Sequence, residues 1–166
     1  MKNMEKLRNA TLIFLVKKSQ GEIIDICLAM KKRGFGMNRW NGVGGKVNGE
    51  NETIEDAAKR ETKEEIGVIV KRLNKVAELS FYFPNNSAWD QMVHVYFSEN
   101  WDGEPKESEE MNPKWFPKNE LPFQDMWPDD IFWLPEVVKG NVLKAMFKFG
   151  EKDVVLDKEV NIVNEL

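Results

Sequence analysis

The segment KRETKEEIG, residues 59–67, groups three carboxylates in a pattern that helix energetics disfavour. Glu61, Glu64 and Glu65 are spaced i, i+3 and i+4, so on a helix their like charges lie on one side and destabilise it. Carboxylate oxygens suit Mg²⁺ or Mn²⁺, and a divalent cation would offset this repulsion. The spacing therefore predicts metal chemistry, and the alternative is a solvated helix whose acids pair with neighbouring basic side chains.

The helix that carries these acids is predicted to begin after Thr53 and to end at Gly67. Threonine is a favourable N-cap, and glycine in a left-handed conformation commonly ends a helix. At about 100° per residue, Glu61 and Glu65 fall within about 20° of Ile54, in the middle of the apolar stripe. Because burying a carboxylate is costly unless a counter-charge is present, this face favours the metal interpretation.

A glycine-rich segment, residues 31–49, directly precedes this helix. Glycine lets the chain bend sharply and lets backbone amides and carbonyls approach a ligand closely. A small basic cluster also lies within residues 30–36, although the formal net charge of the chain is −4. We expect phosphates to be bound locally at this segment, whereas the acidic balance argues against a surface for nucleic-acid polymers.

Strand-forming sequence surrounds these two segments and defines the expected fold. The expected strands are residues 10–16, 22–30, 68–83, 90–99 and 112–116. Residues 129–146 are expected to be mostly helical despite Pro135, and residues 147–160 to form a terminal hairpin. We therefore expect one domain over residues 1–166, an α/β or α+β sandwich with a mixed sheet covered by two helices.

Composition also bears on the cellular compartment of the protein and on membrane association. No apolar stretch of the 166-residue chain is long enough to span a bilayer, so no membrane partner is expected. A single cysteine, Cys27, excludes an internal disulfide. We expect a monomer in the cytoplasm.

Residues 45–68 resemble the Nudix box. This motif consists of a glycine, five residues of any type, a glutamate, seven residues of any type, and the run Arg-Glu-apolar-x-Glu-Glu-x-Gly-apolar. The core RETKEEIGV matches, as do the seven residues between Glu52 and Arg60. Two positions depart from the motif: six residues instead of five separate Gly45 from Glu52, and Thr62 takes the usual apolar place. Neither departure removes a carboxylate.

The resemblance continues over roughly residues 10–160, in MKKRGFGMNRWNGVGGKV, ESEEMNPKWF, LPFQDMWPDDIFW and FKFG. These segments are similar to the MutT-homologue branch of the Nudix hydrolases, the 8-oxo-dGTP diphosphatase type. The resemblance implies an α/β fold, the Nudix α/β/α sandwich with a mixed sheet and two main helices. It also implies that metal-assisted attack of water on an oxidised purine nucleoside triphosphate releases the monophosphate and pyrophosphate.

Carried over residue by residue, the resemblance implies a site for Mg²⁺, with Mn²⁺ as the second choice. The implied metal ligands are the backbone of Gly44 and the side chains of Glu61, Glu64, Glu65 and Glu110. The same three helix glutamates are the implied catalytic residues, with Arg60 orienting a carboxylate. The implied contacts to the phosphates or sugar come from Lys31, Gly44, Gly45 and Lys46. Solitary surface positions are the alternative for the two lysines.

The resemblance also implies where the purine binds. The implied purine readers are Asn41, Trp127, Asp129 and Asp130, and Thr11 and Phe35 complete the pocket wall. From the residues alone, Asp129 is as well explained as an N-cap and Trp127 as a core residue. Two adjacent acids can share one proton, which would let one pocket accept both oxo- and amino-substituted purines.

Two other functions are compatible with the sequence. One is hydrolysis of another nucleoside diphosphate derivative, such as ADP-ribose or a dinucleotide. The other is a non-catalytic Nudix module that senses nucleotides, although such a module is expected to lack a metal carboxylate and all three helix glutamates are present here.

Overall fold

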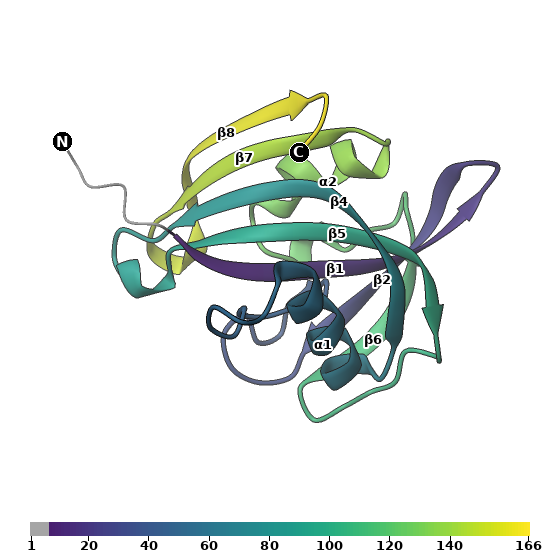
Figure 1. Ribbon diagram of the computed structural model, residues 1–166. Coiled ribbons are helices and arrows are strands. Elements are labelled where there is room, and N and C mark those ends of the chain that lie inside the picture. Colours follow the sequence, from purple (N-terminus) through teal and green to yellow (C-terminus); the bar gives the residue numbers. More distant parts are fainter. Residues whose placement is uncertain (1–6) are drawn as a thin grey trace.

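The computed structural model describes residues 7–166, which form a mixed sheet of eight strands (Figure 1). The strands are β1 Arg8–Ser19, β2 Glu22–Lys31, β3 Trp40–Asn41, β4 Ile69–Tyr82, β5 Gln91–Asp102, β6 Met111–Pro117, β7 Val142–Phe149 and β8 Val155–Val163. Their order is β3-β2-β1-β5-β4-β7-β8, and β6 pairs with β2. The pairs β1–β5 and β4–β7 are parallel and the others are antiparallel, which makes the sheet mixed.

Strand β1 changes partner along its length, and this change creates the site. Its first half runs parallel to β5, whereas only its end, from Val16 to Ser19, pairs with β2. The glycine-rich segment occupies the space where β2 diverges. Ile13 and Val43 exchange backbone hydrogen bonds there, and the Thr11 amide donates to the Gly45 carbonyl at 2.8 Å. The loop backbone therefore acts as a short substitute strand beside β1.

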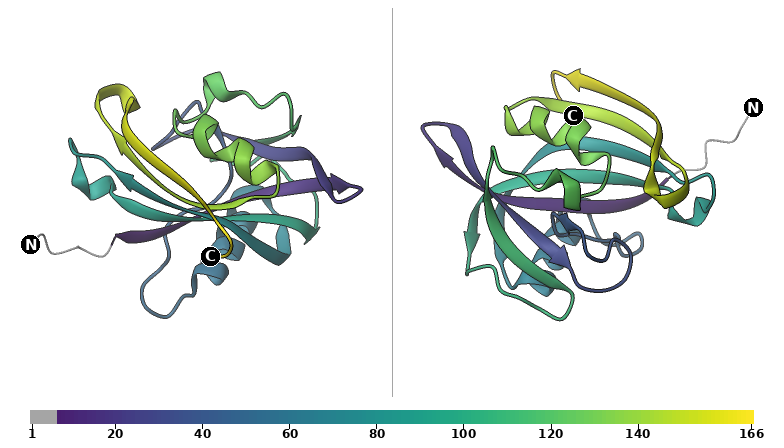
Figure 2. Two further views of the ribbon diagram at one scale, coloured as in Figure 1. Left: turned by 90° about the horizontal axis from the view of Figure 1, so that it is seen from above. Right: turned by 180° about the vertical axis from the view of Figure 1, so that it is seen from behind.

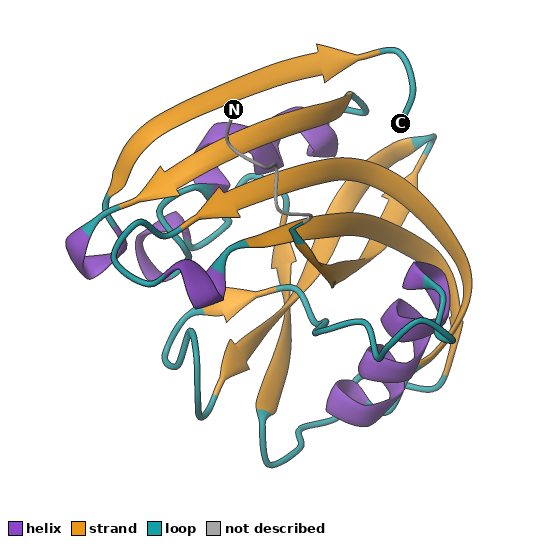
Figure 3. Cartoon of the chain, turned by 60° about the vertical axis from the view of Figure 1, so that its left-hand side comes forward, coloured by secondary structure: helices purple, strands orange, loops and turns teal. Residues whose placement is uncertain are grey.

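The two main helices lie against opposite sides of the sheet (Figure 2, Figure 3). Helix α1 is Ile54–Ile66, and its buried residues pack with one face of the sheet. Helix α2 is Asp130–Val138, and its buried residues join the larger core on the other face. Short 3₁₀ turns occur at Ser87–Trp89, Phe123–Asp125 and Glu151–Asp153. The two layers of helix around a mixed sheet confirm the expected sandwich. Within residues 7–166, no helix is long and apolar enough to cross a membrane.

Helix α1 begins and ends as the sequence predicts. The Thr53 side chain accepts a hydrogen bond from the Asp56 amide at 3.0 Å, and Gly67 closes the helix with φ of 71°. Replacing Thr53 with alanine leaves that amide without its partner, so the free energy of unfolding should fall by about 1 kcal/mol. Urea titration of the purified variant measures this change, and a serine at position 53 should restore most of it.

The expectation of a helix over residues 129–146 is wrong in its second half. Helix α2 ends at Val138, and Gly140 turns the chain with φ of 105°. Strand β7 then follows, and alternate side chains of it are buried. This strand pairs with β4 on one side and β8 on the other, so tertiary pairing overrides the local helix preference of its lysine, alanine and methionine residues.

Candidate active site

An acidic cavity of about 740 Å³ lies between helix α1 and the loop that precedes β6. Its lining residues are Arg33, Lys46, Glu61, Glu64, Glu65, Ser108, Glu109 and Glu110. The fold thus brings Glu110 to the three helix glutamates from a distant part of the chain. Lys32 holds this loop in place, because its amide donates to the Glu110 carbonyl at 2.8 Å and its ammonium pairs with Glu107 at 2.8 Å.

Glu65 is the buried acid of this cavity, with 5% of its surface exposed. Its Oε2 accepts a hydrogen bond from the Gly44 amide at 3.0 Å. Burial raises the pKa of Glu65 to about 7, although the Gly44 amide opposes this shift and the negative charge of Glu61 adds to it. The helix face that looked apolar in the sequence therefore holds a carboxyl group that titrates near neutral pH.

Arg60 organises the other carboxylates of the helix. Its guanidinium contacts Glu52 at 2.7 Å, Glu61 at 2.9 Å and Glu64 at 3.3 Å. Burial raises the pKa of Glu61 and the nearby Arg60 lowers it, with burial the larger effect. Among the described residues 7–166, no three His, Cys, Asp or Glu side chains are arranged as a preformed metal site. Arg60 thus has the contacts of a residue that orients carboxylates.

The glycines of the preceding loop are required by close approaches of the backbone. A Cβ atom on Gly44 would lie 1.9 Å from the Thr11 carbonyl oxygen, and one on Gly45 would lie 2.7 Å from a carboxylate oxygen of Glu61. The Thr11 hydroxyl lies 3.3 Å from the Gly45 carbonyl, to which it donates. The loop therefore fits beside β1 only without a side chain at Gly44, and a side chain at Gly45 would displace the Glu61 carboxylate.

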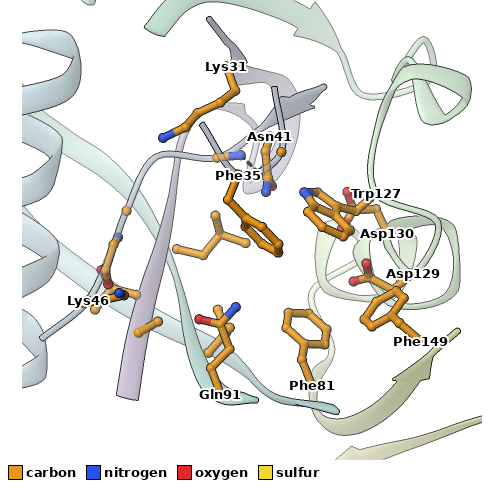
Figure 4. A pocket seen from close by; sticks show the side chains of 18 of the residues that line it. Lys31, Phe35, Asn41, Lys46, Phe81, Gln91, Trp127, Asp129, Asp130 and Phe149 are labelled. Atoms are coloured by element: carbon orange, nitrogen blue, oxygen red, sulfur yellow. Dashed lines mark hydrogen bonds between the residues drawn. The ribbon is translucent and has the colours of Figure 1, made fainter. Parts of the chain in front are cut away.

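A second cavity, of about 310 Å³, adjoins this loop on the other side of β1 (Figure 4). All ten residues expected to bind substrate line it: Thr11, Lys31, Phe35, Asn41, Gly44, Gly45, Lys46, Trp127, Asp129 and Asp130. Lys46 also lines the acidic cavity, so its side chain marks the place where the two cavities meet. In Figure 4, Lys31 and Lys46 lie toward one end of the cavity and Trp127 and the two aspartates toward the other. The cavity thus has a basic end, next to the acidic cavity, and an end with aromatic and acidic side chains.

Asp129 and Asp130 form a buried acidic pair at the inner end of this cavity, each 2% exposed. Asp129 makes no side-chain cap on α2; its Oδ2 instead accepts a hydrogen bond from Trp133 Nε1 at 2.8 Å. Asp130 Oδ2 has no hydrogen-bond partner among the described residues. Such a buried, unsatisfied oxygen is costly and marks a place where a ligand atom can bind.

The protonation of the pair is set mainly by its burial. Burial raises the pKa of Asp129 to about 6, against the lowering effect of the Trp133 hydrogen bond. Burial and the negative charge of Asp129 raise the pKa of Asp130 well above its ordinary value. Burial thus favours the protonated form of both acids, and a pair that shares one proton offers a donor and an acceptor side by side.

Aromatic side chains form much of the remaining wall. Phe35 contacts Trp127 with ring centroids 5.0 Å apart, and Phe149 stacks on Phe83 at 5.0 Å. The Asn41 Oδ1 accepts a hydrogen bond from the Gly42 amide at 2.8 Å, which leaves the Nδ2 group of this side chain as its free donor. The cavity therefore combines flat apolar surfaces with a few polar groups, as small-molecule sites do.

Several lining residues were not predicted from the sequence. The aromatic ones are Phe81, Phe83, Trp133 and Phe149, and the polar one is Gln91 at the start of β5. Alternation in a strand shows that a side chain faces a core but not that the core is hollow at that point, and the same holds for Trp133 on helix α2. Two segments singled out in the sequence did include one of these residues each: LPFQDMWPDDIFW contains Trp133, and FKFG contains Phe149.

Comparisons with known proteins agree with this arrangement. Residues 6–137 match the family model described as NUDIX domain. The oxidized purine nucleoside triphosphate hydrolase of Mus musculus is 42% identical over 161 residues, which cover 97% of this chain and 99% of that protein. The protein of the same name from Danio rerio is 40% identical over 156 residues, covering 94% and 96%. A mutator MutT protein from Bacillus halodurans shares the fold, with a TM-score of 0.78 at 23% identity over 93% of this chain and 98% of that chain.

Proposed function

The chain belongs to the NUDIX family of hydrolases, and from this premise we propose that it hydrolyses oxidised purine nucleoside triphosphates of the 8-oxo-dGTP type. The products would be the nucleoside monophosphate and pyrophosphate. We further propose that the enzyme is a cytoplasmic monomer. The buried state of Cys27, whose thiol pKa burial raises to about 12, supports a free and unreactive thiol.

The observation that carries the proposal is the buried pair Asp129 and Asp130 inside an aromatic cavity that opens toward the helix glutamates. One protonated and one ionised carboxyl can donate to and accept from neighbouring atoms of a purine edge, while an aromatic face such as Trp127 stacks on the base. The names of the two relatives, which are about 40% identical over nearly the whole chain, support the same substrate class.

We propose Mg²⁺, or Mn²⁺, as the cofactor at the acidic cavity. The donor set fits a hard cation, because five carboxylates line one cavity and the backbone of Gly44 lies beside Glu65. Glu61, Glu64, Glu65, Glu110 and the Gly44 carbonyl would hold it. Bound there, the cation would neutralise phosphate charge and lower the pKa of a coordinated water. Lys31 and Lys46 would bind phosphate oxygens, and Arg60 would keep the carboxylates oriented.

The proposal is tested by pyrophosphate release from 8-oxo-dGTP, dGTP and ADP-ribose in the presence of Mg²⁺, compared as kcat/KM. We expect a clear preference for 8-oxo-dGTP. Hydrolysis of ADP-ribose alone would retain the metal site and reject the purine pocket. If none of the three substrates is turned over, the hydrolase assignment to this substrate class is wrong.

Replacing Asp129 with asparagine should weaken the pH dependence of base selectivity. The pKa of Asp129 is about 6, so in the wild type the pair changes its proton count as the pH moves from 5 to 7. The ratio of kcat/KM for an oxo-purine to that for an amino-purine triphosphate should shift by about 10-fold over this range. Asparagine does not titrate, so the step that belongs to Asp129 is absent and the ratio of the variant should change less than that of wild type over this range.

Asparagine at position 129 still accepts the Trp133 hydrogen bond, so the cavity should keep its shape. Asp125→Asn, at an exposed position near the start of the same helix, is the matched control and should retain the wild-type pH dependence. The same pH-dependent ratio in wild type and Asp129→Asn would contradict the role given to the pair.

A further inference from the structure

Arg39, in the loop between β2 and β3, contacts the base pocket from outside. Its guanidinium carbon lies 4.2 Å from the ring centroid of Trp127. Trp127 lines the cavity, whereas Arg39 does not. One face of the indole is thus covered by a cation, so a base that stacks on Trp127 has to use the part of the indole surface that lines the cavity.

Asp153, in the turn between β7 and β8, forms an ion pair that holds Arg39 in this position. Arg39 Nη1 donates to Asp153 Oδ2 at 2.8 Å, and the two side chains are only 25% and 28% exposed. The hydrogen bond joins residues 114 positions apart, so it ties the β2–β3 loop to the turn between β7 and β8. Both surfaces that Arg39 touches, the indole and the carboxylate, suit its planar guanidinium.

The turn that presents Asp153 is built at a conformational cost. Lys152 and Asp153 both have positive φ, 55° and 59°, although neither is glycine. Residues in this region persist where surrounding structure holds them, and they often occur at ligand clamps. Gly36, in the same loop as Arg39, has φ of 82°, which glycine adopts without strain, and a Cβ there would lie 3.2 Å from Trp127 Nε1. The β2–β3 loop therefore approaches the indole at Gly36 and at Arg39, and Arg39 is in turn bound by the strained turn at Asp153.

Arg39 also acts electrostatically on the acidic pair. Its positive charge lowers the pKa of Asp129, in the same direction as the Trp133 hydrogen bond and against the dominant effect of burial. The other charged group that acts on Asp129 is Asp130, its partner in the pair. The side chain that braces the indole thus also influences which proton state of the pair is present.

We propose that Arg39, fixed by Asp153, is a positioning residue for the purine: it holds Trp127 in the stacking orientation, and its positive charge favours the ionised form of Asp129. This role rests on the proposed function, because it presumes a purine in the cavity. The ion pair of Arg39 and Asp153 would thus influence substrate binding although neither residue lines the cavity.

The test compares Arg39→Gln, Arg39→Lys and Asp153→Asn with the wild type on 8-oxo-dGTP. For Arg39→Gln and Asp153→Asn we expect KM to rise by about 10-fold while kcat stays within about twofold, because a desolvated cation–π contact and its anchor are worth about that factor. Arg39→Gln should also move the pH dependence of kcat/KM to higher pH. Lysine keeps the positive charge of arginine but not its planar guanidinium. Arg39→Lys should therefore have the pH dependence of the wild type and a KM between those of the wild type and Arg39→Gln.

Lys158→Gln is the matched control, since Lys158 also lies over an aromatic ring, Phe132 at 4.4 Å, but neither residue lines the cavity. It should leave KM and the pH dependence unchanged. If Arg39→Gln and Asp153→Asn only lower the melting temperature and leave KM and pH dependence as in wild type, Arg39 is merely structural and the inference is wrong. If the wild type hydrolyses 8-oxo-dGTP and the variants keep its KM and pH dependence, only this inference is wrong. If the wild type does not hydrolyse 8-oxo-dGTP, the proposed function and this inference are both wrong.

Discussion

Replacing Glu65 with glutamine should reduce kcat by about 1,000-fold or more while the protein stays folded. Glutamine has nearly the same shape, and its carbonyl oxygen can still accept the hydrogen bond from the Gly44 amide. The variant lacks the negative charge that the proposed cation site requires and the carboxyl that can exchange a proton. Pyrophosphate release from 8-oxo-dGTP under saturating Mg²⁺ measures the loss, and circular dichroism checks the fold.

The control for this variant is Glu55→Gln on the same helix. Glu55 is exposed and does not line the acidic cavity, so its replacement should change kcat by less than about twofold. Near-full activity of Glu65→Gln would show that the buried acid is not part of the metal site, and it would return the helix to the solvated, ion-paired interpretation.

Glu65→Gln should also change how stability depends on pH when no divalent cation is added. Burial raises the pKa of Glu65 to about 7 from an ordinary 4.5, so between these values the native state binds more protons than the unfolded state. Stability contributed by the protonated acid is therefore present below pH 4.5 and lost as pH rises through 7. At pH 8.5 in EDTA the glutamine variant should be more stable than wild type by about 3 kcal/mol, and the difference should vanish near pH 4.

The second large effect is expected at Gly44, where alanine should destabilise the protein by about 3 kcal/mol or more. A Cβ atom would lie 1.9 Å from the Thr11 carbonyl oxygen and 2.6 Å from its carbon, and both belong to the backbone of β1. No side-chain rotation relieves such a contact, so the loop or the strand has to move. Because the same loop positions the amide that binds Glu65, activity should fall as well.

Gly49→Ala is the matched control in the same glycine-rich segment. Gly49 has φ of 61° but open space around it, so alanine there should cost only about 1 kcal/mol of backbone strain. Urea unfolding of both variants gives the comparison. Equal free energies of unfolding for the two variants would mean that the loop does not depend on its close approach to β1.

Local interactions explain what the sequence by itself determined. Thr53 and Gly67 cap helix α1 through bonds to residues three or four positions away, and helical periodicity alone placed Glu61 and Glu65 on its packed face. The expected strands are likewise present, since alternation and β-branched residues are local signals. Motif resemblance then named ten residues that line the 310 Å³ cavity, because their types and order in the chain can be compared without knowing their distances.

Tertiary structure decided everything that depends on distant pairing. The parallel pairing of β1 with β5 brings Gln91 and the aromatic residues of β4 and β7 to one hollow, and the loop before β6 delivers Glu110 to the helix glutamates. Residues 142–146, which looked helical, became a strand because β4 and β8 supply hydrogen-bond partners on both sides. The contact of Arg39 with Asp153 depends in the same way on two loops 114 residues apart. These contacts between distant residues cannot be predicted from a local sequence pattern, because they form only when the strands pair and the cores on the two faces of the sheet are packed.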